Sequence, residues 1–210
     1  MLTESATQAL SILRDASLFQ WYVIPLFALV VYVYSVEIER RNWNLVFAGL
    51  AFWGMDWINE IWNSLVLHFS GYAPMWGAPD DTAFLILVGL NIEIMFMFSI
   101  AGIAFGKMLP PDKKQKILGI PNRFFFAITN SAFCVVVEIW LNAIGALTWD
   151  WSFWSASSPI PIFLFGYLHF FLVSYWVHDM KTIRAKAITV GAIFGVAIFG
   201  LVVFGALGWI

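Results

Sequence analysis

Long runs of hydrophobic residues, separated by short polar segments, dominate the chain. A membrane-spanning helix needs about 20 mostly apolar residues, because each residue adds about 1.5 Å and the hydrocarbon layer is about 30 Å thick. The runs are continuous and lack the two-residue alternation of strands in a transmembrane barrel. The pattern therefore predicts six transmembrane helices, over Leu18–Val36, Trp43–Phe69, Ala83–Gly106, Phe124–Trp149, Ile160–His178 and Ala187–Ile210.

These helices are predicted to form an all-α, polytopic membrane helix bundle, as a single domain over residues 18–210. Residues 1–17 are predicted to form a short interfacial helix with Thr3 or Ser5 as its N-cap, because a hydroxyl oxygen can accept a hydrogen bond from a free backbone N–H group at the start of a helix. The last predicted helix carries Ala187, Gly191 and Gly195 at intervals of four. This small-residue face permits close helix contact, within the bundle or in a homodimer.

Basic residues are confined to one side of the predicted bundle. All of the 11 Lys and Arg residues except Arg14 lie in the segments 37–42, 107–123 and 179–186. The segments on the other side, Ser70–Thr82 and Asp150–Pro159, contain none. Because basic loops are retained in the cytoplasm, the three basic segments are predicted to be cytoplasmic and both termini to lie outside.

Composition excludes several classes of protein. The chain is 61% hydrophobic and 11% charged, whereas soluble domains have about 25% charged residues. A nucleic-acid-binding protein and a secreted enzyme are thereby excluded, and a single cysteine excludes a disulfide scaffold. The hydrophilic segments contain no Gly-rich phosphate loop and no Cys/His cluster, so any chemistry is predicted to occur within the membrane.

Five ionisable side chains, from four different helices, are predicted near the middle of the membrane. Counting along each helix places them within roughly 9 Å of depth. An ionised side chain at that depth costs about 2.5–3.5 kcal/mol, and a whole domain is stable by only about 5–15 kcal/mol. These side chains are therefore expected to face one another and to share protons or bind a ligand. They are Asp56, Glu60, Glu93, Glu138 and His169.

Aromatic and amide side chains are expected to surround this polar centre. Several share a helix face with one of the acids or with the histidine. Other tryptophans, including Trp76 and Trp154, fall at the ends of the predicted helices and are typical of the aromatic belt at a membrane surface. The predicted substrate-binding residues are Trp53, Trp57, Asn59, Asn63, Phe96, Asn142, Phe165 and Trp176.

Buried acids among aromatic rings indicate proton chemistry on a lipid. A carboxyl group in a low-dielectric pocket can keep its proton at neutral pH and act as a general acid, and ring faces can stabilise a developing cation. The sequence thus predicts an isomerase or cyclase of an isoprenoid or sterol-like substrate that enters sideways from the bilayer, with no cofactor. In this hypothesis Glu60 or Glu93 donates the proton, Glu138 or His169 accepts one, and Asp56 and Asn63 orient them.

The acids also resemble the pattern of emopamil-binding or EXPERA-type membrane proteins, which include sterol isomerases. The resemblance covers Trp43 to Met180 and rests on Glu60-Ile-Trp62, Glu93, Glu138 and His169. The sequence departs from that pattern by an additional last helix, by Asp56 where a His is expected, and by His169 where an Asn is expected. It is equally similar to small membrane-embedded terpene cyclases, which hold buried Glu and Asp among aromatics. Both resemblances imply carboxylate chemistry on a sterol or isoprenoid.

Other functions use the same residues. Glu60, Glu93, Glu138 and His169 could bind iron or manganese in an oxidase or hydroxylase, although the Glu-x-x-His spacing of bundled di-iron sites is absent and no metal site is predicted. Buried acids also mark proton relays, as in a proton-coupled carrier. Finally, the acids could seal an interface in an accessory subunit or form a structural hydrogen-bond network between helices.

Overall fold

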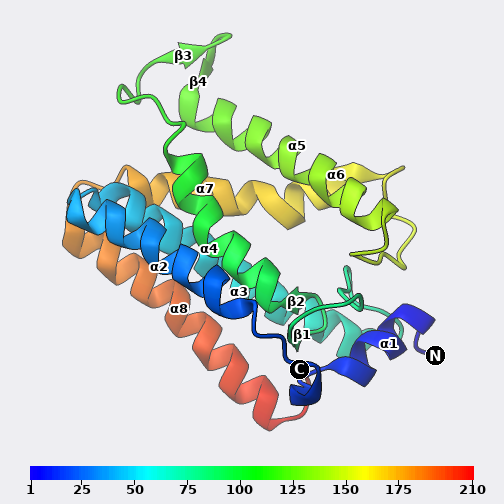
Figure 1. The fold of residues 1–210 in the computed structure, drawn as a ribbon. Helices are drawn as coiled ribbons and strands as arrows, with labels where there is room; N and C mark the ends of the chain where they lie inside the picture. Colours follow the sequence, from blue (N-terminus) through cyan, green and yellow to red (C-terminus); the bar gives the residue numbers. More distant parts are fainter.

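A computed structural model describes residues 1–210 and shows a mostly helical bundle built around one long helix (Figure 1). This helix, α3, packs against four others, and a further helix, α5, lies at the periphery against the segment that ends in α7. The helices are α2 (Val23–Glu39), α3 (Trp43–Ser70), α4 (Ile92–Gly106), α5 (Asn122–Ala143), the short α6 (Pro159–Pro161), the π-helical η2 (Ile162–Leu168), α7 (His169–His178) and α8 (Ile183–Ala206).

Close packing of α3 against α4 and α7 forms the centre of the bundle. A Cβ atom placed on Gly102 of α4 would lie 2.8 Å from the Cα atom of Gly49 on α3, so the two backbones approach as only glycine permits. Next to this crossing, the ring of Phe52 lies 5.6 Å from that of Phe170 and 4.9 Å from that of Phe171. These aromatic contacts fix α7 on α3.

The N-terminal segment forms the predicted short helix. It is α1 (Glu4–Ile12), followed by the 3-10 turn η1 (Ala16–Leu18). Thr3 is the N-cap and accepts a hydrogen bond from the backbone N–H of Ala6 at 3.2 Å, which confirms one of the two predicted caps. Ser5 instead donates to the Asp150 carboxylate at 2.5 Å, so α1 is held against the loop that follows α5.

The predicted helix over Ala83–Gly106 is wrong for residues 83–91. Two short strands, β1 (Leu85–Leu87) and β2 (Leu90–Asn91), form an antiparallel hairpin, and α4 begins only at Ile92. Asn91 is its N-cap, with Oδ1 accepting from the backbone N–H of Ile94 at 2.8 Å. Hydropathy cannot separate a buried strand from a buried helix, and the Asn91 cap was the available signal for the helix start.

Three helical segments are long and apolar enough to cross a membrane: Asn122–Ala143, Pro159–His178 and Ile183–Ala206. They correspond to the last three predicted spans, although the fourth ends at Ala143 and not at Trp149. Of the others, α2 has 17 residues and α4 has 15, and a helix the length of α4 spans only about 22 Å. That the first three predicted spans cross the membrane stays a prediction, as does the orientation of the chain.

The predicted basic segments lie at one end of the bundle, where they form ion pairs. Between α4 and α5 is a small hairpin of β3 (Lys116–Ile117) and β4 (Ile120–Pro121), which projects from the helices in Figure 1. Nearby, Lys107 Nζ lies 2.6 Å from Glu37 Oε1. The Arg123 guanidinium donates to both carboxylate oxygens of Asp179 at 2.9 Å. The N and C termini both lie at the opposite end of the bundle (Figure 1).

Candidate functional site

Two connecting segments, residues 71–91 and 144–158, fold together over one end of α3. Gly77 and Thr148 join them by exchanging backbone hydrogen bonds of 3.0 and 2.9 Å. Asn63 on α3 fixes the first segment, because its Nδ2 donates to the Trp76 carbonyl at 2.7 Å and its Oδ1 accepts from the Met75 N–H at 2.7 Å. The result is a cap that holds the Trp76 and Trp154 rings stacked with centroids 5.6 Å apart.

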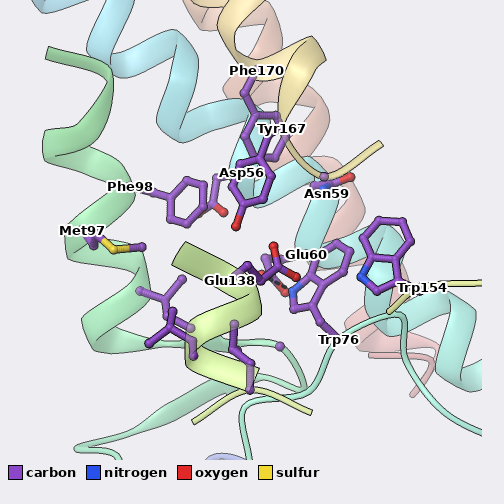
Figure 2. Close-up of a pocket in the computed structure, with 15 residues that line it drawn as sticks. Asp56, Asn59, Glu60, Trp76, Met97, Phe98, Glu138, Trp154, Tyr167 and Phe170 are labelled. Atoms are coloured by element: carbon purple, nitrogen blue, oxygen red, sulfur yellow. Dashed lines mark hydrogen bonds between the residues drawn. The ribbon is translucent and has the colours of Figure 1, made fainter. Parts of the chain in front are cut away.

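Beneath this cap, α3, α4, α5 and the η2–α7 segment enclose a cavity of about 50 Å³ (Figure 2). A space of that size can hold a few water molecules or the reacting part of a larger molecule. Its lining combines three carboxyl groups with aromatic and aliphatic side chains. The lining residues are Asp56, Asn59, Glu60, Trp76, Gly89, Ile94, Met97, Phe98, Glu138, Leu141, Leu147, Trp154, Gly166, Tyr167 and Phe170.

The three carboxyl groups come from two helices and are almost fully buried. Asp56 and Glu60 lie one turn apart on α3 and are 2% and 3% exposed, and Glu138 on α5 is 5% exposed. Trp76 Nε1 donates to Glu60 Oε1 at 2.8 Å, and Trp149 Nε1 donates to Glu138 Oε1 at 3.1 Å. Figure 2 shows the carboxyl groups of all three residues turned toward the same space.

Several polar atoms in this cavity have no partner. Asp56 Oδ2, Glu60 Oε2 and Trp154 Nε1 are buried and make no hydrogen bond. No Lys, Arg or His residue lines the cavity. Three ionised carboxylates without a cation would be very costly there. The arrangement is suited to hold protons, or to bind a molecule that supplies the missing hydrogen bonds.

A second, larger space adjoins the cavity on the flank of the bundle. It is a mostly apolar groove of about 920 Å³, lined chiefly by α4 and α5. The same side chains of α4, α5, η2 and the cap line both spaces, so they form the partition between them. These shared residues are Ile94, Met97, Phe98, Leu141, Leu147 and Tyr167.

Glu93 does not reach the cavity, contrary to the expectation that it shares a site with Glu60 and Glu138. It lies in the first turn of α4 and accepts hydrogen bonds from Thr82 Oγ1 at 2.6 Å, from the Ala83 N–H at 2.8 Å and from the Tyr22 hydroxyl. The depth estimate failed because it counted residues along an uninterrupted helix. Glu93 instead lines the large groove.

His169 also lies outside the cavity. Its ring is partly exposed, with Nδ1 3.4 Å from the carbonyl oxygen of Leu164. The preceding η2 segment is a π-helix, and its wider turn changes which side chains face inward. Tyr167 and Phe170 line the cavity in place of His169.

The four residues considered as ligands in the alternative metal-dependent function are consequently not brought together. Glu60 and Glu138 share the cavity, whereas Glu93 and His169 lie elsewhere. No three His, Cys, Asp or Glu side chains come together in a metal-binding arrangement. The geometry gives no support to the oxidase or hydroxylase alternative.

Only one of the eight predicted substrate-binding residues lines the cavity. This is Asn59, whose Nδ2 donates to the Phe165 carbonyl at 3.3 Å. Asn63 holds the cap, and Asn142 donates to the Leu147 carbonyl at 2.9 Å. The Phe165 side chain is exposed on the surface of the bundle.

The remaining four predicted substrate-binding residues are also elsewhere. Trp53, Trp57 and Phe96 line another apolar groove of about 390 Å³ beside α8, and Phe96 also lines the 920 Å³ groove. Trp176 is exposed on α7. Helical spacing showed that these rings are close to the acids in sequence, but it could not show which rings line the cavity.

Sequence reasoning missed two aromatic residues that line the cavity with the acids. Trp76 and Trp154 were expected in the interfacial belt, yet they are 9% and 1% exposed and lie in the cap. The turn residues Pro74, Gly77 and Pro79 indicate that the chain bends around Trp76. No pattern in the sequence pairs Trp76 with Glu60, or brings Tyr167 into the lining of the cavity.

The apolar helices and the comparisons with known proteins define a membrane protein. Residues 3–206 match a family described as an uncharacterized membrane protein family, and the chain belongs to it. A protein of Archaeoglobus fulgidus, described as uncharacterized, is 60% identical over 187 residues, which are 89% of each chain. A second uncharacterized protein of that organism is 53% identical over 53 residues, 25% of this chain and 95% of its own. No solved structure matches.

Proposed function

We propose that this protein is an integral-membrane enzyme of the isomerase or cyclase type, acting on an isoprenoid or sterol-like lipid by carboxylate acid–base chemistry. One observation carries the proposal: Asp56, Glu60 and Glu138 gather in a cation-free cavity that is separated from a lipid-sized groove only by a few side chains. Isolated structural acids would be expected to have cationic partners or a complete set of hydrogen bonds.

The hydrogen bonds suggest a division of roles among the three acids. Asp56 accepts no hydrogen bond, and its Oδ2 is buried without a partner. Glu60 and Glu138 each accept an indole N–H bond, which favours a carboxylate over a carboxylic acid. Asp56 is therefore the proposed proton donor, and Glu138, assisted by Glu60, the proposed acceptor.

The proposed reaction begins when the Asp56 O–H bond breaks and its proton forms a C–H bond at a substrate double bond. A carbocation results, and the faces of Phe98, Tyr167 and Phe170 lie around the cavity to stabilise it. Loss of a proton from a neighbouring carbon to a carboxylate then restores a double bond. The reaction is redox-neutral, and ring closure before the last step would make it a cyclisation.

The membrane arrangement that goes with this function is six crossings with both termini outside and the segments 37–42, 107–123 and 179–186 in the cytoplasm. Both termini lie at one end of the bundle and the segments with the basic residues at the other, which supports an even number of crossings (Figure 1). The proposed partners are the lipid substrate and bilayer lipid. On α8, added Cβ atoms at Gly191 and Gly195 would meet nothing within 4 Å, so a homodimer through this face stays a prediction.

The function is tested with the purified protein in lipid vesicles. Bound lipids are extracted and identified by mass spectrometry, and candidate isoprenoid or sterol lipids are incubated with the protein in D2O. The proposal expects deuterium at carbon in the product, lost in Asp56→Asn and retained in Glu4→Gln, a solvent-exposed acid of α1. Deuterium incorporation that is equal in both variants, or proton transport without lipid conversion, would contradict it.

A further inference from the structure

The large groove has the size of a binding site and a pronounced polarity along its length. Its volume of about 920 Å³ falls in the range of small-molecule sites, roughly 300–1,000 Å³. Phe133 and Cys134 of α5 and Ala104 and Phe105 of α4 line its apolar part. Phe133 is 57% exposed, so the groove is open along the flank of the bundle.

The acidic and amide side chains of this groove, together with a tyrosine, come from the start of α2 and α4 and from the loop before β1. They are Tyr22, Asp81, Asn91 and Glu93. Asn91 uses its Oδ1 to cap α4, which leaves its Nδ2 available as a donor to a ligand oxygen. Asp81 is exposed and also lines the groove.

The charge at this polar end is negative and has no counter-ion. No Lys, Arg or His residue lines the groove, and neither Asp81 nor Glu93 forms a salt bridge. Like charges repel each other, so a phosphate group would be disfavoured at this end. A hydroxyl group could donate to a carboxylate and accept from Asn91 Nδ2.

We infer that this groove binds a long-chain alcohol, with its hydroxyl group at Asn91 and Asp81 and its hydrocarbon chain along α4 and α5, and that it discriminates against the corresponding phosphate ester. This inference rests on the proposed function. The hydrocarbon chain of the alcohol would pass the partition formed by Met97, Phe98 and Tyr167, where one of its double bonds can reach the carboxyl groups of the cavity. It narrows the substrate class to isoprenoid or sterol-like alcohols.

The test uses a photoreactive probe, an isoprenoid alcohol that carries a diazirine in its chain, and the matched monophosphate of the same chain. The full-length protein in vesicles is irradiated with each probe, and labelled peptides are mapped by mass spectrometry. The alcohol is expected to label residues 92–106 and 122–143 about tenfold more than the phosphate does, a difference of about 1.4 kcal/mol. Equal labelling by both probes, or labelling concentrated on α8, would overturn the inference.

Two pairs of variants sharpen this result. Ala104→Trp fills the groove and is expected to lower alcohol labelling about tenfold, whereas Val196→Trp, on the exposed face of α8, is a control that should not. Asp81→Lys is expected to raise labelling by the phosphate, whereas Glu39→Lys, an exposed substitution outside the groove, should leave it unchanged. A fully labelled Ala104→Trp variant, or phosphate labelling unchanged in Asp81→Lys, would refute the assignment.

The same labelling in Glu138→Gln separates binding from catalysis. This variant keeps the groove and removes a carboxylate of the cavity, so alcohol labelling should persist. If labelling follows the expectations but no deuterium enters any lipid, the groove assignment stands and the proposed function fails. If labelling fails, the groove assignment falls whether or not the cavity is catalytic.

Discussion

The acids at the basic end of the bundle and the acids of the cavity are in opposite electrostatic situations. At the basic end, Glu37 contacts Lys107 and accepts a hydrogen bond from Asn42 at 3.0 Å, and Asp179 forms two hydrogen bonds with Arg123. In the cavity, Asp56 has no partner at all. The acids at the basic end therefore hold helices together. Those of the cavity have too few contacts to offset the free-energy cost of their burial.

Another buried charge at the basic end completes this contrast. Lys186 is 2% exposed, and its Nζ donates to the carbonyl oxygens of Val177 and His178 at the C-terminus of α7. A cation at that position is stabilised by the partial negative charge of the helix end. At the basic end, each of these buried charged groups therefore contacts a group of opposite charge or partial charge. The cavity acids have no cationic partner, which indicates that they are kept for function and not for stability.

The largest expected difference between the two regions is in activity. Glu138→Gln removes a proposed proton acceptor, and the loss of a general acid or base lowers turnover about 10²–10⁴-fold. Asp179→Asn should leave the lipid conversion rate close to that of the unmodified protein, because Asp179 lies outside the cavity. Rates are measured by product analysis under single-turnover conditions, and a similar loss in both variants would remove the distinction.

For the free energy of unfolding, substitutions at the basic end are expected to have the larger effect. Arg123→Met breaks the pair with Asp179, and because the two side chains are 15% and 22% exposed, the expected loss is about 1–3 kcal/mol, below that of a fully buried pair. Asp56→Asn should leave the free energy of unfolding unchanged or slightly higher, since no partner is lost. Thermal unfolding in detergent checks both, and strong destabilisation by Asp56→Asn would show that this acid has a structural role.

The cap over the cavity should be sensitive to a single methyl group. A Cβ atom on Gly89 would lie 2.4 Å from Asn63 Nδ2 and 2.6 Å from Trp76 Nε1, so Gly89→Ala is expected to cost about 1–3 kcal/mol by overpacking. It should also displace Trp76 from Glu60 and lower activity. Gly191→Ala is the matched control, with open space around its Cβ, and a Gly89→Ala protein as stable and active as this control would contradict the described cap.

The smallest effect concerns pH. Burial by itself raises the pKa of Asp179, but hydrogen bonds from Arg123 and His178 lower it below its ordinary value. The pair therefore stabilises the fold fully above an ordinary Asp pKa of about 3.9, and this stability is lost as the pH falls through the lower, folded pKa. Unfolding measured between about pH 6 and pH 3 should show a loss of up to about 1 kcal/mol that is absent in Asp179→Asn.

Periodicity and hydropathy predicted the helices better than the site. The α3 range was predicted to within a residue, and the buried face with Asp56, Asn59, Glu60 and Asn63 follows from their spacing alone. Glu138 was placed with them by depth along an uninterrupted helix. These predictions succeed because they depend only on the repeat of a regular helix.

The failures occur where the backbone is irregular. A hairpin over residues 83–91 displaces Glu93, and the π-helix before His169 changes which residues face inward. Trp76 reaches Glu60 through a loop whose path depends on Asn63 and on pairing with Thr148. Such contacts join segments far apart in the chain, and no local periodicity encodes them.

The protonation of the cavity acids is the central claim, and infrared spectroscopy at neutral pH measures it directly. A carboxyl group that holds its proton without a cation gives a carbonyl-stretch band distinct from that of a carboxylate, and this band shifts in D2O. The expected result is a protonated-carboxyl band that disappears in Asp56→Asn and persists in Asp179→Asn. A spectrum without that band, or one that Asp56→Asn leaves unchanged, would contradict the account.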